Sequence, residues 1–287
     1  MSEWSGLPAS VRMRTGELPG DATEVRLRAG QRVEVRAPGR SLLCGEAMSA
    51  QEVRAAVDEM ARRSLYAWEE ELKEGYFTLQ DGCRVGVGGR FAVREGRIEA
   101  LTHISSAAVR LARAVKGCAQ PLLERLCPGG RVQSALILSP PGLGKTTLLR
   151  DLARCLSAGE GGWPACRVGL ADERCELAAC RSGVPTLDVG PRTDVYEACP
   201  KSLAIPRMVR ALGCDVIVTD ELGQAQDAAC VLDALRCGVR VIASAHARTL
   251  EEAMQRPVLR ELLAAKAFDA VVELSGRPGQ VRRVARL

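Results

Sequence analysis

The segment that decides the fold reads Ser139-Pro140-Pro141-Gly142-Leu143-Gly144-Lys145-Thr146-Thr147, and it directly follows the apolar run Ala135–Leu138. An apolar strand, a glycine-rich loop and a helix in this order are typical of a phosphate-binding loop. Main-chain N–H groups and the positive end of the helix there point at phosphate. We expect Lys145 to contact the β- and γ-phosphates of a nucleotide, and the Thr146 hydroxyl to complete the coordination of Mg²⁺. Residues Pro141–Thr147 are therefore the predicted nucleotide-binding loop.

One position departs from the phosphate-binding pattern G-x-x-x-x-G-K-[ST]. The pattern has glycine where this chain has Ser139. Serine fits at that position if the backbone keeps a conformation that L-residues adopt without strain. The substitution therefore does not remove the prediction of a phosphate-binding loop.

Two adjacent carboxylates close a second apolar run. Asp220 and Glu221 follow Val216–Thr219, about seventy residues after the predicted loop. Ligands of open α/β sheets bind at the carboxyl edge of the strands, so we expect Asp220 beside the Mg²⁺ ion. Glu221 is then placed to polarise a water molecule for in-line attack on the γ-phosphate. Together the two segments predict an ATP-hydrolysing enzyme that uses ATP and Mg²⁺.

From residue 131 onward, apolar runs alternate with helical patterns, which predicts parallel β-α units. The expected strands are Ala135–Leu138, Val168–Ala171, Val216–Thr219, Val239–Ser244 and Ala270–Leu274, and the expected helices are Thr146–Leu156, Ser202–Leu212, Asp227–Cys237 and Leu250–Ala265. The additional strand Val168–Ala171, between the loop strand and the strand of the paired acids, is typical of RecA-like and AAA-like proteins. We therefore predict an α/β RecA/AAA-like P-loop core with a mainly parallel sheet over residues 121–287.

The first part of the chain reads as a smaller α+β domain, predicted over residues 1–120. Apolar residues alternate with polar ones on both sides of Ala29-Gly30-Gln31, as in a strand–turn–strand unit. Ser49 and Glu52 have the spacing of a capping box, which opens a helix. A second helical stretch is expected at Leu65–Lys73.

A glycine-rich run lies in a predicted hairpin, Phe77–Phe91, which turns at Asp81-Gly82. The run Gly86-Val87-Gly88-Gly89 is not a dinucleotide fingerprint, because G-x-G-x-x-G would need glycine where the chain has Phe91. Glycines that let two strands approach closely explain the run better. Farther along, Arg110 and Arg113 have helical spacing ahead of the predicted domain boundary.

The composition excludes several classes of protein. The chain has 287 residues, of which 47% are hydrophobic, with 40 basic and 35 acidic side chains, so it is long and apolar enough for packed domains. Its longest stretch without a charged residue, Val132–Gly144, is shorter than the roughly 20 residues of a membrane-spanning helix. The first residues show no apolar run of a signal peptide, which favours the cytoplasm. The 12 cysteines form no C-x-x-C pair and the chain has only 2 histidines, which argues against zinc.

Other polar residues follow the predicted strands or lie in loops. His246 ends the strand after the paired acids, where it could contact the γ-phosphate or the attacking water, although a lone histidine is often structural. Arg192 lies in a charged, loop-like stretch and is a candidate for an arginine finger that completes the site of a neighbouring subunit. Arg174 and Lys201 compete for that role, and the sequence does not rank the three. The pair Asp172-Glu173 lines either the nucleotide or a subunit interface, or forms a solvated turn.

These segments together resemble the stage III sporulation protein AA family of endospore-forming bacteria, predicted ATPases that are similar to secretion and type IV pilus motor ATPases. The resemblance rests on Glu24–Arg28, Leu65–Leu72, Arg84–Arg90, Ile104–Ser106, Pro140–Arg150, Asp172–Arg174, Asp188–Asp194, Cys199–Lys201, Asp215–Glu221 and Ala245-His246. Ser139 and Gly223–Gln226 depart from the family pattern. The resemblance implies an ATPase that powers a transenvelope complex between mother cell and forespore. It also implies a hexameric ring that lies at the membrane through membrane-protein partners of the stage III sporulation complex.

Two other functions share the same core. A RecA-like ATPase that acts on nucleic acid would predict a basic stripe interleaved with aromatic residues, yet the chain has only three Trp, three Tyr and three Phe. A nucleotide-dependent scaffold would bind ATP with little turnover, and the intact pair Asp220-Glu221 argues against it. We therefore expect an oligomeric motor ATPase with no nucleic-acid partner.

Overall fold

A computed structural model describes residues 6–61, 68, 72–73, 75–79, 83–111, 115–180 and 183–287. Contacts within the chain separate two units, residues 1–113 and 114–287, so the division comes before the predicted boundary at residue 120. Ala119 shows why, because it is fully buried in the core of the second unit and its N–H group donates to the Asp151 carboxylate at 2.8 Å. The segment just before residue 120 therefore belongs to the second unit.

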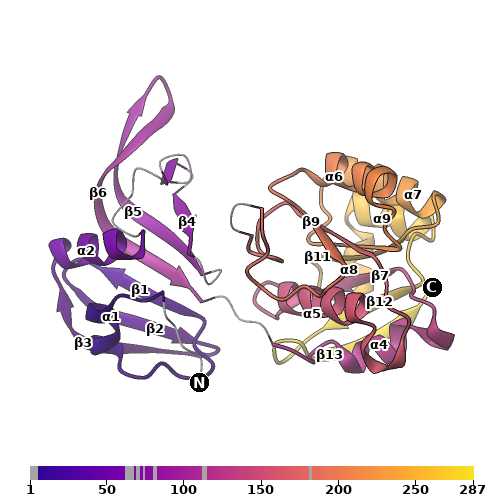
Figure 1. The fold of residues 1–287 in the computed structure, drawn as a ribbon, viewed down its shortest axis with the longest axis horizontal. Helices are drawn as coiled ribbons and strands as arrows, with labels where there is room; N and C mark the ends of the chain where they lie inside the picture. Colours follow the sequence, from indigo (N-terminus) through magenta and orange to yellow (C-terminus); the bar gives the residue numbers. More distant parts are fainter. Residues whose placement is uncertain are drawn as a thin grey trace. The chain divides into compact units, whose positions relative to one another are not determined.

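Within the described residues, the first unit contains an antiparallel sheet with strand order β3-β2-β1-β6-β5-β4 (Figure 1). The strands are β1 (Glu24–Arg28), β2 (Gln31–Ala37), β3 (Arg40–Met48), β4 (Tyr76–Thr78), β5 (Arg84–Arg94) and β6 (Arg97–Arg110), and the helices are α1 (Ala9–Thr15) and α2 (Ala50–Met60). Alternate strand residues, such as Val25 and Val85, are buried in one cluster with Val11 of α1 and Val53 of α2. The predicted strand–turn–strand unit is confirmed.

Helix α2 begins as the sequence predicts. The Ser49 hydroxyl accepts a hydrogen bond from the Glu52 N–H group at 3.2 Å, and the Glu52 carboxylate accepts one from the Ser49 N–H group at 2.7 Å. This capping box satisfies two N–H groups that the first helical turn leaves without partners. The predicted helical stretch Leu65–Lys73 and the turn Asp81-Gly82 lie wholly or largely outside the described residues.

The glycine-rich run permits a close approach of β5 and β6. A Cβ atom on Gly89 would lie 1.8 Å from the carbonyl oxygen of His103 on the neighbouring strand. The prediction of closely approaching strands is therefore confirmed at this position. The helical spacing of Arg110 was misleading, because β6 continues through Arg110, which pairs with Glu24 of β1 and Arg84 of β5 in the sheet register. In a strand, the local period of two replaces the helical period.

The second unit contains a sheet with strand order β13-β12-β7-β11-β10-β8-β9. The strands are β7 (Ala135–Leu138), β8 (Val168–Asp172), β9 (Thr193–Glu197), β10 (Val216–Thr219), β11 (Arg240–Ala245), β12 (Ala270–Leu274) and β13 (Val281–Arg286). The pairs from β12 to β9 are parallel, and the edge strand β13 is antiparallel. The predicted mainly parallel α/β sheet is confirmed. Strands β9 and β13 escaped prediction, because neither contains a continuous apolar run.

The order in space differs from the order in the chain at one important point. Strand β8 comes between β7 and β10 in the sequence, but β11 lies between them in the sheet. Ala245 of β11 pairs with Leu138 of β7, and Ala243 of β11 pairs with Thr219 of β10. The carboxyl end of β11, with His246, therefore lies between the phosphate loop and the paired acids.

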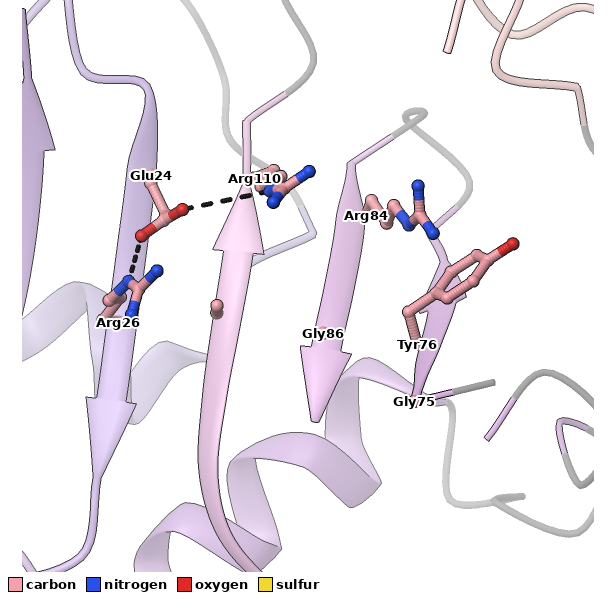
Figure 2. Close-up of a pocket in the computed structure, with 8 residues that line it drawn as sticks. Glu24, Arg26, Gly75, Tyr76, Arg84, Gly86 and Arg110 are labelled. Atoms are coloured by element: carbon pink, nitrogen blue, oxygen red, sulfur yellow. Dashed lines mark hydrogen bonds and ion pairs between the residues drawn. The ribbon is translucent and has the colours of Figure 1, made fainter. Parts of the chain in front are cut away.

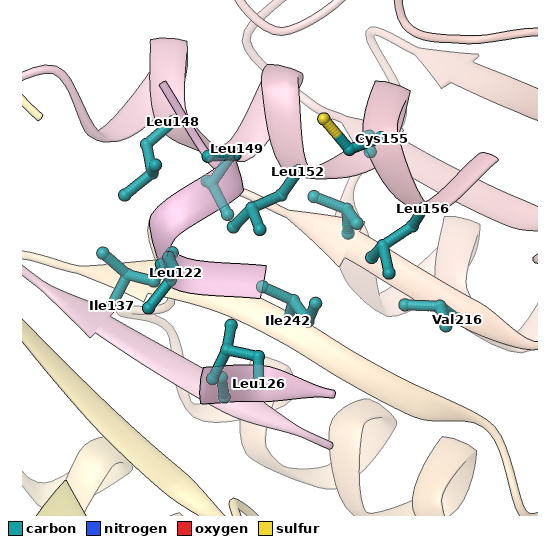
Figure 3. Close-up of a cluster of buried hydrophobic side chains, with 14 of the residues drawn as sticks. Leu122, Leu126, Ile137, Leu148, Leu149, Leu152, Cys155, Leu156, Val216 and Ile242 are labelled. Atoms are coloured by element: carbon teal, nitrogen blue, oxygen red, sulfur yellow. The ribbon is translucent and has the colours of Figure 1, made fainter. Parts of the chain in front are cut away.

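Helices cover both faces of this sheet, which explains why its strands are apolar on both sides. They are α4 (Gln120–Leu126), α5 (Lys145–Ala158), α6 (Lys201–Arg207), α7 (Ala225–Arg236), α8 (Leu250–Met254) and α9 (Pro257–Ala264). Leu122 of α4 and Leu152 of α5 pack with Ile137 and Ile242 on one face (Figure 3). Helices α6, α7 and α9 pack on the other face. No helix among the described residues is both long and apolar enough to cross a bilayer.

Two expected helices are interrupted by proline. The stretch Leu250–Ala265 is not one helix but α8 and α9, because Pro257 lacks an N–H group and instead begins the second helix. The stretch Ser202–Leu212 contains Pro206 in α6 and continues as a π-helical turn over Met208–Leu212. The two predicted helices therefore differ from the observed ones in their boundaries, because of proline, and the order of elements is as predicted.

The close approach at Gly89 predicts a stability effect. Gly89→Ala is expected to lower the free energy of unfolding by about 1–3 kcal/mol, because the new methyl group overlaps a backbone carbonyl that cannot move aside freely. Gly86→Ala is the matched control on the same strand, since its Cβ would lie 3.8 Å from the nearest atom, the Ala108 carbonyl oxygen. Melting temperatures from circular dichroism compare the two variants, and equal values would contradict the close approach.

Candidate functional site

The predicted phosphate loop has the backbone that its glycines permit. Gly142 and Gly144 both have φ of 80°, in the left-handed region, and helix α5 begins at the next residue, Lys145. Ser139 lies outside the left-handed region and is fully buried, and its hydroxyl donates to the Pro140 carbonyl at 2.7 Å. Serine therefore fits the first position of the loop without backbone strain.

The turn between β12 and β13 lies against the phosphate loop. The Gly279 N–H group donates to the Leu143 carbonyl at 2.9 Å. A Cβ atom on Gly144 would lie 3.2 Å from the Gly279 nitrogen and 3.5 Å from Cβ of Pro278. This support for the loop was missed by sequence reasoning, because its residues lie more than a hundred positions apart in the chain.

Lys145 lies at the centre of the site. Its ammonium group donates to the Ser139 carbonyl at 2.8 Å and to the Pro140 carbonyl at 3.3 Å, and it lies 2.9 Å from Nδ1 of His246. Burial lowers the pKa of Lys145, and the nearby Glu221 charge works in the opposite direction. The lysine is therefore held over the loop, beside the histidine that follows β11.

The paired acids continue this row of contacts. Nε2 of His246 lies 3.3 Å from Oε1 of Glu221, and the guanidinium of Arg174 donates to Oε2 of the same carboxylate. Glu221 has a φ of 28°, which is uncommon for a residue with a side chain. Its N–H group donates to the Ser244 hydroxyl at 3.1 Å, which helps to hold this backbone conformation. Lys145, His246, Glu221 and Arg174 thus form one continuous chain of contacts.

Asp220 is buried, and one of its carboxylate oxygens has no hydrogen-bond donor among the described residues. Its Oδ1 atom accepts no hydrogen bond from any residue that the structure describes, although the Lys201 ammonium lies 3.4 Å away. Burial and the nearby Asp172 charge raise the pKa of Asp220 to about 6, against the opposing effect of Lys201. A buried carboxylate oxygen without a donor fits a Mg²⁺ ion or a water bound to it, and Thr146 lies in the first turn of α5. The residues present therefore fit the predicted metal ion.

Lys201 holds two acids of the site. It is buried, and its ammonium lies 2.5 Å from Glu173 and 3.4 Å from Asp220. Burial works to lower the pKa of Lys201, but the hydrogen bond to Glu173 and the Asp220 charge leave it raised. Asp172 is fully buried and accepts hydrogen bonds from three N–H groups of the following turn, those of residues 176–178. Asp172 therefore shapes the loop instead of forming a solvated turn.

Arg192 lies at the opposite edge of the sheet within its own chain. Its carbonyl accepts a hydrogen bond from the Val168 N–H group, and its guanidinium donates to the Ser157 carbonyl near the end of α5, both at 2.9 Å. Arg192 therefore lies beside the first residue of β8, whereas Asp172 is the last residue of that strand. A strand rises about 3.3 Å per residue, so the two ends of β8 lie about 13 Å apart. The structure brings Arg174 and Lys201, but not Arg192, to the site of the same chain.

Sequence comparisons match this chain to one family over nearly its whole length. The family model described as sporulation stage III, protein AA matches residues 10–286. The chain is 38% identical to stage III sporulation protein AA of Bacillus subtilis (strain 168), over 97% of this chain and 92% of the relative.

This chain belongs to the stage III sporulation protein AA family.

Solved structures share the fold of this family member. The ATPase DotB of Yersinia pseudotuberculosis has a TM-score of 0.61 at 14% identity, with 92% of this chain and 74% of DotB covered. The pilus retraction motor PilT, solved with bound ADP, has a TM-score of 0.58 at 16% identity, with 92% of this chain and 78% of PilT covered. The predicted fold class, an α/β core with a mainly parallel sheet and a smaller α+β domain, is confirmed.

A basic groove crosses the first unit and was also missed by sequence reasoning. Its volume is about 260 Å³, and small residues such as Gly86 form part of its lining (Figure 2). The Arg84 guanidinium lies 3.4 Å from the centre of the Tyr76 ring, a cation–π contact. Glu24 forms ion pairs with Arg26 and, at 4.0 Å, with Arg110. The groove is therefore lined by three guanidinium groups and by the Glu24 carboxylate, which pairs with two of them.

The buried ion pairs of Lys201 predict a large stability effect. Lys201→Met removes the ammonium but keeps much of the side-chain volume, which leaves Asp220 and Glu173 without their counter-charge. The free energy of unfolding is expected to fall by about 3–5 kcal/mol. Lys116→Met is the control, because the side chains of its pair with Asp188 are 62% and 45% exposed, and about 0–1 kcal/mol is expected there. Urea unfolding measures both, and similar losses would contradict the buried role of Lys201.

Proposed function

We propose that this chain is an ATP-hydrolysing motor ATPase. The observation that supports the proposal best is the continuous row from Lys145 through His246 to Glu221, with buried Asp220 at the same edge of the sheet. A phosphate-binding lysine, a metal-binding carboxylate and a carboxylate that orients water are the parts that hydrolysis of a nucleoside triphosphate requires. The likeness to DotB and PilT supports the fold on which these parts are placed.

Each residue has a defined role in the proposed reaction. The N–H groups of residues 142–147 cradle the phosphates, and Lys145 neutralises negative charge that develops on them. Thr146 and Asp220 would hold Mg²⁺, which would supply additional positive charge to the phosphates. Glu221 orients the attacking water and accepts its hydrogen bond. His246 contacts both Lys145 and Glu221 and therefore links the position of the lysine to that of the glutamate.

We further propose that the motor is a homo-oligomer, most simply a hexamer, with a partner subunit's arginine completing each site. Arg192 suits this role because its exposed side chain lies far from the site of its own chain. The family membership supports a role in sporulation. In this proposal the motor energises a transenvelope complex between mother cell and forespore, and membrane proteins of that complex hold it at the cytoplasmic side of the membrane.

Two substitutions separate binding from turnover. Lys145→Ala is expected to abolish ATP binding, because the phosphates lose their main counter-charge, whereas Glu221→Gln is expected to retain ATP binding and to lose nearly all turnover. Fluorescent-nucleotide titration and phosphate release measure the two properties, with Lys116→Ala and the exposed Glu124→Gln as controls. Unchanged affinity in Lys145→Ala would refute the phosphate loop, and normal hydrolysis by Glu221→Gln would remove Glu221 from its role.

The shared site predicts complementation between subunits. Arg192→Ala and Glu221→Gln subunits, each inactive alone, should regain some ATPase activity when mixed, because some interfaces then contain a complete site. Size-exclusion chromatography with light scattering, with and without ATP and Mg²⁺, measures the assembly in parallel. Absence of rescue at every mixing ratio, in samples that do form mixed oligomers, counts against Arg192 as the completing arginine.

A further inference from the structure

Both carboxylate oxygens of Glu221 are already engaged in the structure. Arg174 donates to Oε2, and Nε2 of His246 lies 3.3 Å from Oε1. A carboxylate held by a guanidinium is a weaker acceptor for a proton of water. The backbone of Glu221 is also held in a left-handed conformation through the Ser244 hydroxyl. Glu221 would be a stronger acceptor for a proton of an attacking water once Arg174 released its carboxylate.

The loop that carries Arg174 is firmly fixed on both sides of the arginine. Before it, the Glu173 carboxylate is paired with buried Lys201 at 2.5 Å. After it, the fully buried Asp172 carboxylate accepts the N–H groups of residues 176–178. The backbone around Arg174 is therefore held in place, and from it the guanidinium reaches the Glu221 carboxylate.

The same loop is connected to the helix that begins at the phosphate loop. Arg150 of α5 is buried and donates to the Leu177 carbonyl at 2.5 Å and to the Glu176 carbonyl at 2.7 Å. Arg150 follows Lys145 by five residues, which corresponds to about 7.5 Å along the helix. A displacement of α5 when its N-terminus binds phosphate would therefore act on the Arg174 loop through Arg150.

We propose that Arg174 is a positioning residue that latches Glu221 in a non-productive orientation, and that binding of a nucleoside triphosphate opens this latch through α5 and Arg150. The inference rests on the proposed ATPase function. The Arg174 side chain is 53% exposed, so water solvates it readily once the ion pair opens. Opening the latch uses part of the free energy of nucleotide binding, so its removal strengthens binding and raises the rate.

A matched pair of variants tests the latch. Arg174→Ala is compared with Arg167→Ala, whose ion pair with Asp215 at 2.7 Å joins the same two strands, β8 and β10, at the opposite edge of the sheet. The affinity for Mg²⁺ with AMP-PNP is measured by titration, and kcat and KM for ATP by phosphate release. Arg174→Ala is expected to bind AMP-PNP about two- to fivefold more tightly, the range for an ion pair of this exposure. Its kcat should rise, and the control should change neither quantity.

A double substitution tests whether Glu221 is the partner through which Arg174 acts. In a Glu221→Gln chain, where the charged partner is already missing, Arg174→Ala should change AMP-PNP affinity much less than it does in the otherwise unchanged protein. The AMP-PNP affinity of Arg174→Lys should lie between those of the unaltered protein and Arg174→Ala, because an ammonium keeps the charge but not the guanidinium geometry. An equal gain in affinity in both backgrounds would contradict the pairing.

The alternatives give opposite results. Weaker AMP-PNP binding with lower kcat in Arg174→Ala would make Arg174 a phosphate-contacting residue and would overturn the latch. Unchanged affinity and unchanged kcat would reduce the contact to a surface ion pair and would also overturn it. Failure of the unaltered protein to bind AMP-PNP with Mg²⁺ is a separate result, because it removes the proposed ATPase function and the latch with it.

Discussion

The site depends on the parallel register of four neighbouring strands. Strands β7, β11, β10 and β8 lie side by side in this order, and all four end at the same edge. The residues that follow them form a row in the same order: Lys145, His246, Glu221 and Arg174. Adjacent strands lie about 4.8 Å apart, which is a spacing that side chains of this length bridge. A different strand order would separate these side chains although every local motif remained.

The acidic edge is stable because its buried charges are paired. Asp220 raises the electrostatic cost of the fold, since burial disfavours its charged form. Lys201 offsets part of this cost by lying between Asp220 and Glu173. The remaining hydrogen-bonding capacity of Asp220 is what a metal ion or its water would use. The proposed Mg²⁺ site rests on this oxygen.

The loop after β8 connects parts of the site that the strand order alone does not connect. Asp172 fixes its backbone, Arg150 ties it to α5, and Arg174 reaches across to Glu221. A shift at the phosphate end of α5 therefore has a direct mechanical route to the glutamate of β10. In a motor ATPase, such a route would couple the presence of the nucleotide to the readiness of the site for hydrolysis.

The sequence by itself determined the local elements that short-range rules encode. The glycine pattern and the residues flanking it predicted the phosphate loop, continuous apolar runs predicted five parallel strands, and the capping pair Ser49 and Glu52 predicted the start of α2. The acids Asp220 and Glu221 were found for the same reason, because an apolar strand that ends in carboxylates is a local pattern. Pro206 and Pro257 lie within two of the predicted helices and account for the helix boundaries that differ.

Only the tertiary structure decided which of these elements are neighbours. The position of β11 between β7 and β10, the pairing of Arg174 with Glu221, the burial of Lys201 and the support of the loop by Gly279 all join residues far apart in the chain. It also placed Arg192 at the far edge, away from the site of its own chain. Hydrophobic periodicity and motif spacing indicate which face of each segment is buried. They do not encode the order in which strands lie in the sheet, and these contacts follow from that order.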